Sequence, residues 1–241
     1  MKNSQKLLSM RALALPLILA FQSAHAASIV AADDNYVLNS ASSTVQNADG
    51  NLVLKRASNN IRKSWLKFDL TGQNVDFSQS GTVTLTLAGD SSSDTSFKIA
   101  LYALDDVGAT APTWTESTIT WNNAPGNDTG GTGINDLEPG ETTFISETAT
   151  ISNNTAAGTQ YQFVIPDLSV FLQSDNTITT IAIASVQPNS GPSLALASSE
   201  NATESWRPTL TFTAVPEPGS FALLSGMLAL TWVALGRRRV H

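Results

Sequence analysis

The chain has 241 residues, with 13 Lys and Arg, 20 Asp and Glu, and a net charge of −7 at neutral pH. It has no cysteine, and its two histidines, His25 and His241, lie near the two ends of the chain. The composition excludes disulfide frameworks and thiol catalysis, and between these ends it also excludes Ser-His-Asp triads and ordinary zinc sites. Chemistry based on paired carboxylates, or on a Tyr or Lys base, remains open.

The first 26 residues have the features of a cleavable signal peptide. Basic residues at positions 2, 6 and 11 precede an apolar stretch, residues 12–21, that is too short to cross a membrane. Ala24 and Ala26 supply the small residues that signal peptidase recognises. We therefore expect cleavage after Ala26 and export across the inner membrane, with an uncleaved N-terminal anchor as the alternative.

Residues 27–214 show the alternating pattern of β-strands and form the expected folded domain. Apolar side chains recur at every second position between clusters of Gly, Asn, Asp, Ser and Pro, a pattern typical of an all-β antiparallel sandwich of the jelly-roll kind. Seven basic and 19 acidic residues fall in this region, a net charge near −12, which excludes a general nucleic-acid binder because phosphate would be repelled. The residues predicted to face the core are Val83, Leu85, Leu87, Phe97, Ile99, Leu101, Tyr161, Phe163, Ile165, Ile181, Ile183, Leu194, Leu196, Leu210 and Phe212.

A hairpin is predicted between residues 51 and 70, where two strands flank the sequence ASNN. Leu52, Leu54, Leu66, Phe68 and Leu70 would face the core, which leaves Lys63, Trp65 and Lys67 on an outward face. This region holds five of the seven basic residues of the domain.

A tryptophan among basic residues suits a glycan ligand. The indole can stack on a sugar ring, while Lys and Arg pair with the carboxylates of an acidic sugar. The competing interpretation is that the lysines protect a sheet surface or pair with nearby acids, while Trp65 covers the flank of the sandwich. The predicted glycan-binding residues are Lys55, Arg56, Arg62, Lys63, Trp65 and Lys67.

The segment WTESTITWNNAP, residues 114–125, is predicted to be a packing corner. If residues 118–121 form a short strand, Ile119 and Trp121 face the core together, and the Asn and Pro residues that follow make the exit turn. Glu116 has no second acid at an interpretable spacing, so a catalytic role for it is not expected.

The C-terminal segment begins with the tag Val215, Pro216, Glu217 and Pro218. Residues 219–236 carry no charge and would form a helix of about 27 Å, close to the thickness of a bilayer core. Three arginines, residues 237–239, follow at once, and their positive charge would keep the basic tail, residues 237–241, in the cytoplasm. Two prolines leave the tag extended and accessible just outside the membrane.

Two resemblances follow from these motifs. The tag, helix and arginine cluster resemble the PEP-CTERM sorting signal of Gram-negative bacteria, which implies processing by an exosortase in a host that makes exopolysaccharide. The order of DDNYVLNS, LVLKR, RKSWLKFDL, WTESTITWNNAP and RPTLTFT resembles the DNRLRE-type domain, also classed as carbohydrate-binding module family 96, over residues 30–213. That resemblance implies a jelly-roll sandwich that binds alginate-like acidic glycans, with Lys63, Trp65 and Lys67 on its basic strand.

We therefore expect an exported, non-catalytic module that binds an acidic exopolysaccharide or cell-wall glycan. Signal peptidase and exosortase would act on it during export, the C-terminal helix would hold it in the membrane transiently, and the cell surface or extracellular matrix would be its destination. A structural biofilm-matrix or adhesion protein is one alternative, and a carboxylate-dependent glycosidase or polysaccharide lyase is another.

No resident cofactor is expected. A structural calcium ion would find oxygen ligands in several acidic side chains, although these are equally suited to a solvated loop. The acidic residues concerned are Asp33, Asp34, Asp128, Asp136, Glu138 and Glu141.

Overall fold

The computed structural model describes residues 26–46, 50–57, 59–73, 80–89, 97–104, 113–130, 137–151, 155–167, 178–186, 193–213 and 227–228. The predicted signal peptide, apart from its last residue, and the sorting tag lie outside the described residues, as does the predicted membrane helix except for residues 227–228. None of the helices among the described residues is long and apolar enough to cross a membrane.

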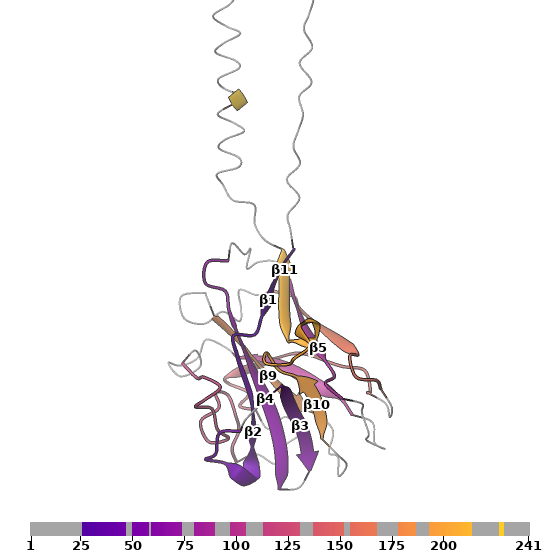
Figure 1. Ribbon diagram of the computed structural model, residues 1–241. Helices are drawn as coiled ribbons and strands as arrows, with labels where there is room; N and C mark the ends of the chain where they lie inside the picture. Colours follow the sequence, from indigo (N-terminus) through magenta and orange to yellow (C-terminus); the bar gives the residue numbers. More distant parts are fainter. Residues whose placement is uncertain are drawn as a thin grey trace, which may run out of the picture.

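Two antiparallel sheets form a sandwich, which confirms the all-β prediction (Figure 1). The smaller sheet has the order β1 (Ala26–Val30), β11 (Thr209–Thr213), β5 (Gly81–Thr86) and β8 (Gln160–Ile165). The larger sheet has the order β10 (Leu194–Ala197), β3 (Asn51–Ala57), β4 (Asn60–Asp69), β9 (Ile178–Ser185), β6 (Ile99–Leu104) and β7 (Thr142–Glu147). Strand β2 (Asp33–Leu38) pairs with β4 off this path, and two short 3-10 turns, η1 (Asn39–Ala41) and η3 (Glu204–Trp206), follow β2 and β10.

The predicted hairpin is confirmed as β3 and β4. Lys55 lies opposite Arg62 and Ala57 opposite Asn60, so a two-residue loop joins the strands. Asn59 in this loop has a φ of 57°, a left-handed conformation that Asn tolerates better than most residues. The turn therefore sets the register that sends alternate side chains of β4 to opposite faces of the sheet.

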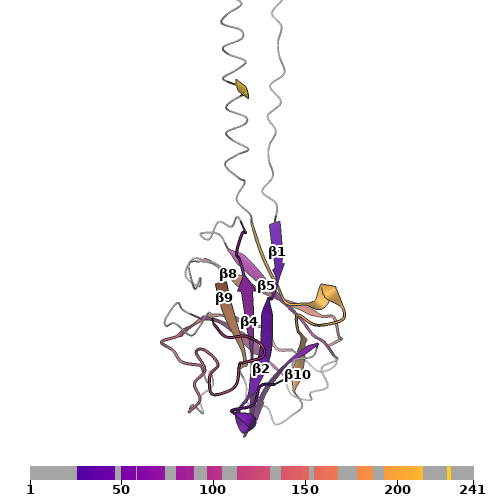
Figure 2. The same ribbon diagram turned by 60° about the vertical axis from the view of Figure 1, so that its left-hand side comes forward.

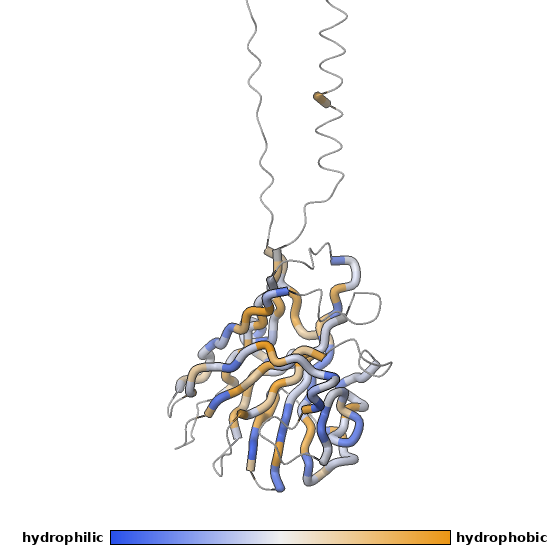
Figure 3. The backbone as a smooth tube through the Cα atoms, turned by 180° about the vertical axis from the view of Figure 1, so that it is seen from behind, coloured by the Kyte–Doolittle hydropathy of each residue, from blue (hydrophilic) through white to orange (hydrophobic). Residues whose placement is uncertain are grey.

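The main core lies between the two sheets and contains the inward residues that alternation predicts. Tyr161 is the exception among them, because it is only partly buried against the core. In Figure 3 the hydrophobic stretches run along the strands, while hydrophilic residues gather toward the loops. The buried members of the core include Leu52, Leu54, Leu66, Phe68, Leu70, Val83, Leu85, Leu87, Phe97, Ile99, Leu101, Phe163, Ile165, Ile181, Ile183, Leu194, Leu196, Leu210 and Phe212.

A second apolar cluster lies on the outer face of the larger sheet, where it is covered by the segment of residues 113–130. Its members from the strands include Trp65, Tyr102 and Ala182, and those from the segment include Ile119 and Trp121. The burial of Ile119 and Trp121 confirms a packing corner. The short strand predicted over residues 118–121 is wrong, because turns with bonds such as Ala124 N–H to the Thr120 carbonyl shape the segment instead.

Candidate functional site

The sequence predicts that the outer face of β4 is a basic strip exposed to solvent, and this prediction is wrong. Lys63, Trp65 and Lys67 do point away from the main core, yet they are only 1%, 0% and 8% exposed. Trp65 pairs with Asn35 of β2 on one side and with Ala182 of β9 on the other, so it lies within the sheet. The covering segment closes over this face and removes all three side chains from water.

Each of the three buried side chains holds the covering segment in place. The indole Nε1 of Trp65 donates a hydrogen bond to the Pro125 carbonyl at 3.0 Å. Lys63 Nζ donates to Asn127 Oδ1 at 2.6 Å and lies 4.4 Å from the centre of the Trp121 ring. Asn127 in turn donates to the Trp121 carbonyl at 2.6 Å.

Lys67 repeats this arrangement at the start of the segment. Its Nζ donates to the Trp114 carbonyl at 2.6 Å, lies 5.1 Å from the centre of the Trp114 ring, and forms an ion pair with Asp33 at 2.5 Å. A lysine enclosed by an aromatic face and oxygen acceptors is a stable way to bury a cation. These lysines therefore act as clamps between β4 and the covering segment.

Two of the predicted basic residues meet on an accessible surface, and we call Lys55 and Arg62 the hairpin pair. They lie directly opposite each other in β3 and β4, so their side chains share one face, and both are half-buried. Arg62 Cζ lies 5.9 Å from the centre of the half-exposed Tyr36 ring, and its Nε donates to Asn60 Oδ1 at 3.2 Å. Arg56, by contrast, is only 8% exposed, and its Nη1 donates to the Val186 carbonyl at 3.4 Å.

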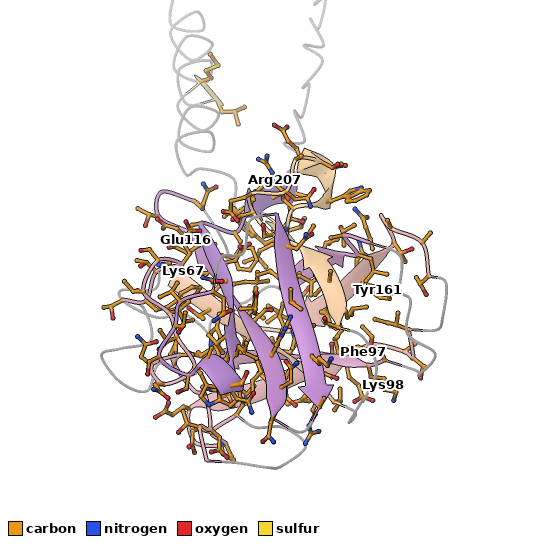
Figure 4. All side chains as sticks on the ribbon, turned by 60° about the horizontal axis from the view of Figure 1, so that its bottom comes forward. Lys67, Phe97, Lys98, Glu116, Tyr161 and Arg207 are labelled. Carbon is orange, nitrogen blue, oxygen red and sulfur yellow. The ribbon has the colours of Figure 1, made fainter. Side chains whose placement is uncertain are left out.

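A cluster of carboxylates beside β2 was missed by the sequence analysis. Asp34 is fully buried, its Oδ2 accepts a hydrogen bond from Ser199 N–H at 2.6 Å, and its Oδ1 bonds to none of the residues that the structure describes. Burial, with a contribution from the charge of Glu200, raises the pKa of Asp34 to about 8. Burial also raises the pKa of Glu116, with further contributions from Glu200 and Asp33. Figure 4 shows Glu116 next to Lys67, which lowers the same pKa slightly.

The geometry of these acids does not suit glycoside hydrolysis. Glu200 lies close enough to Glu116 to raise the pKa of its carboxyl group, whereas the two carboxyl groups of a glycosidase stand roughly 5–9.5 Å apart with the sugar between them. The described residues contain no group of three or more acids or histidines that could hold a metal ion. Asp136 lies outside the described residues, so the predicted calcium ion stays a prediction.

Comparison with known proteins gives one family match. The model of carbohydrate-binding module family 96 matches residues 25–167. No curated protein matches the chain. A chain from the crystal structure of the T13 IBDV viral particle aligns at 15% identity and a TM-score of 0.19, over 81% of this chain and 40% of that chain. So low a TM-score supports no inference about fold or function.

Proposed function

Because the chain belongs to carbohydrate-binding module family 96, we propose that it is a non-catalytic module that binds an acidic polysaccharide at the β3–β4 hairpin. Membership of the family supports carbohydrate binding as such. The observation that favours an acidic ligand is the hairpin pair. Two half-buried cations, Lys55 and Arg62, lie opposite each other, and Arg62 lies over the Tyr36 ring.

The chemistry of this surface fits a uronic acid polymer. A guanidinium group can bind a carboxylate through two parallel hydrogen bonds, and an aromatic ring can pack against the C–H face of a sugar. The charge of the domain, near −12, repels a polyanion over most of its surface, so attraction is confined to the few accessible cations. Exposed charge pairs contribute only about 0.2–1 kcal/mol each, so affinity should be weak and should fall with salt.

We also propose that the protein is exported and sorted by an exosortase. The support is in the sequence: a basic and apolar leader that ends in Ala24 and Ala26, and the tag Val215, Pro216, Glu217 and Pro218 ahead of an uncharged segment and three arginines. Signal peptidase and exosortase would be its processing enzymes, and the cell surface or matrix its destination. An acidic exopolysaccharide is the ligand that such a location would offer.

Titration of the purified exported protein with alginate oligomers at low and high salt tests the proposed ligand. We expect the double variant Lys55→Gln, Arg62→Gln to bind roughly 2- to 30-fold more weakly at low salt, the range set by two exposed charge pairs. Lys98→Gln is the matched control, since Lys98 is also accessible but pairs with Glu147 at 3.0 Å. Equal losses in both variants would mean that only net charge matters, and unchanged binding in the double variant would exclude the hairpin.

Product analysis tests the non-catalytic part of the proposal. We expect no new reducing ends and no unsaturated sugars after incubation with alginate. Release of products that stops in a Glu116→Gln variant would identify an enzyme and overturn this part.

A further inference from the structure

Trp206 differs from the other tryptophans that the structure describes. Trp65, Trp114 and Trp121 are at most 5% exposed, whereas Trp206 is only half-buried. The indole nitrogens of Trp65 and Trp114 donate to Pro125 and Thr180, but none of the described residues accepts a hydrogen bond from Trp206 Nε1. A half-buried indole whose N–H group bonds to none of the described residues is thus present outside the covered face.

The support beneath this indole is a glycine that no other residue could replace without movement. A Cβ atom at Gly158 would lie 3.1 Å from Cζ2, 3.4 Å from Cε2 and 3.5 Å from Nε1 of Trp206, and the φ of +85° disfavours any side chain. Gly158 N–H donates to the Leu87 carbonyl at 2.9 Å, which fixes this loop to the end of the smaller sheet. The ring therefore rests on anchored backbone.

Further hydrogen bonds fix the short turn that carries the ring. Trp206 N–H donates to the Thr203 carbonyl at 2.9 Å within η3, and Gln160 Nε2 donates to the Ser205 carbonyl at 3.3 Å. Because the indole is held before any ligand arrives, little conformational entropy remains to be lost when a ligand binds to it.

Arg207 follows Trp206 directly in the chain and supplies a cation at the end of η3. Its Nε donates to the Asn201 carbonyl at 3.0 Å, which orients the side chain, and none of the described residues bonds its terminal nitrogens. Figure 4 shows Arg207 at the margin of the domain. The fork of the guanidinium group can therefore bind an anion at the end of the turn that carries Trp206.

We propose that Trp206 and Arg207 form a second carbohydrate contact, which rests on the proposed function. In this contact a pyranose ring packs on the indole, Nε1–H donates to a hydroxyl group, and the guanidinium group binds the carboxylate of the same or the adjacent uronic acid. The β3–β4 hairpin lies at the foot of the molecule and η3 beside β11 and β5, well above it, in both ribbon views (Figures 1 and 2). A polymer, but not a short oligomer, can therefore engage both contacts, and the second binding event becomes intramolecular.

The contact is tested with single variants and two probes, polymeric alginate, which is long enough to span both contacts, and the neutral glucan laminarin. Trp206→Ala should weaken binding of alginate by about 3- to 10-fold at both low and high salt, because stacking is not screened. Arg207→Gln should weaken binding of alginate at low salt and leave binding of laminarin, where it occurs, unchanged. Wild-type affinity for alginate in both variants would overturn the proposal.

Two comparisons keep the result interpretable. Trp206→Phe retains an aromatic face without the N–H group and should retain most of the affinity; if Trp206→Ala lowers the melting temperature, Trp206→Phe and Arg207→Gln decide the question. The hairpin variant Lys55→Gln, Arg62→Gln separates this contact from the proposed function. If affinity falls only in the hairpin variant, the second contact is rejected. If affinity falls only in the variants of residues 206 and 207, the hairpin is rejected as a binding site. A wild-type protein that binds neither probe rejects both sites.

Discussion

Replacing Asp34 by asparagine tests whether the carboxylate cluster beside β2 limits the stability of the domain. Asp34 is fully buried, its Oδ2 accepts a hydrogen bond from Ser199 N–H at 2.6 Å, and its Oδ1 has no partner among the described residues. Asparagine has nearly the same shape, can keep the bond from Ser199 through its carbonyl oxygen, and does not titrate. The change therefore removes the titration and keeps the bond from Ser199.

The expected size follows from the pKa of this group. Burial is the main cause that raises the pKa of Asp34 from 3.8 to about 8, so between these pH values the folded protein holds a proton that the unfolded chain has lost. The free energy of unfolding must then fall as pH rises through this window. At about 1.36 kcal/mol for each pKa unit the full effect is on the order of 5 kcal/mol, or roughly 10–20 °C in melting temperature for a domain of this size.

Thermal and urea unfolding between pH 5 and pH 9 measure the effect. The wild type should lose stability across this range, while Asp34→Asn should show a nearly flat profile and exceed the wild type at pH 9. Asp69→Asn is a control in which the effect has the opposite sign. Hydrogen bonds from Thr71 lower the pKa of the exposed Asp69, so its charged form stabilises the fold. Removing that charge should therefore lower the stability slightly above pH 4. Parallel profiles of the wild type and Asp34→Asn, or a less stable Asp34→Asn at pH 9, would refute the reasoning.

Further predictions concern the covering segment and processing. Lys63→Met leaves the amide oxygen of Asn127 without its donor and should cost about 1–3 kcal/mol in urea unfolding, whereas Lys55→Met, at the exposed hairpin, should cost little. Trp121→Ala removes a side chain that is only 4% exposed and should cost about 3–5 kcal/mol, while a stability equal to that of the wild type would mean that the segment does not pack on β4. In the native host the mature protein should lack residues 219–241, which an intact mass that still includes His241 would contradict.

The strands could be predicted from the sequence because the side chains of a strand alternate between two faces. Val83, Leu85 and Leu87 enter the core together for that reason alone, and so do the inward leucines of the hairpin. Alternation also assigned Lys63 and Trp65 to the opposite face correctly. It gives the face of the sheet on which a residue lies, and no information about what covers that face.

The covering segment could not be placed because its contacts join residues far apart in the chain. Trp65 meets Pro125 across 60 positions and Lys67 meets Trp114 across 47. One signal was available: Ile119 and Trp121 needed an apolar surface, and the outward Trp65 offered one. The neighbouring lysines obscured it, because a lysine is usually solvated unless acceptors and an aromatic face enclose it.

The carboxylate cluster left no comparable signal. Asp33 and Asp34 are adjacent, yet on a strand they point to opposite faces, one to Lys67 and the other to Ser199, which is 165 positions away. No local spacing could have indicated that Glu116 and Glu200 would meet. Acids brought together by the fold alone can be found only once the strands are placed.

Burial of the clamping lysines has a consequence for how a polyanion could be held. With Lys63, Lys67 and Arg56 in the interior, the domain presents only four accessible cations, namely those of the hairpin pair, Lys98 and Arg207. Lys98 is neutralised by Glu147, so the remaining charge lies at two separate places: the hairpin pair, where Arg62 lies over the Tyr36 ring, and Arg207, which follows Trp206 in the chain. Each contact by itself is weak, because exposed ion pairs are screened by salt. Once a polymer is bound at one contact, its high effective concentration favours binding at the other, so a chain that spans both contacts binds more tightly than a chain that reaches only one. Because each contact alone is weak, the domain should bind long chains in preference to short ones.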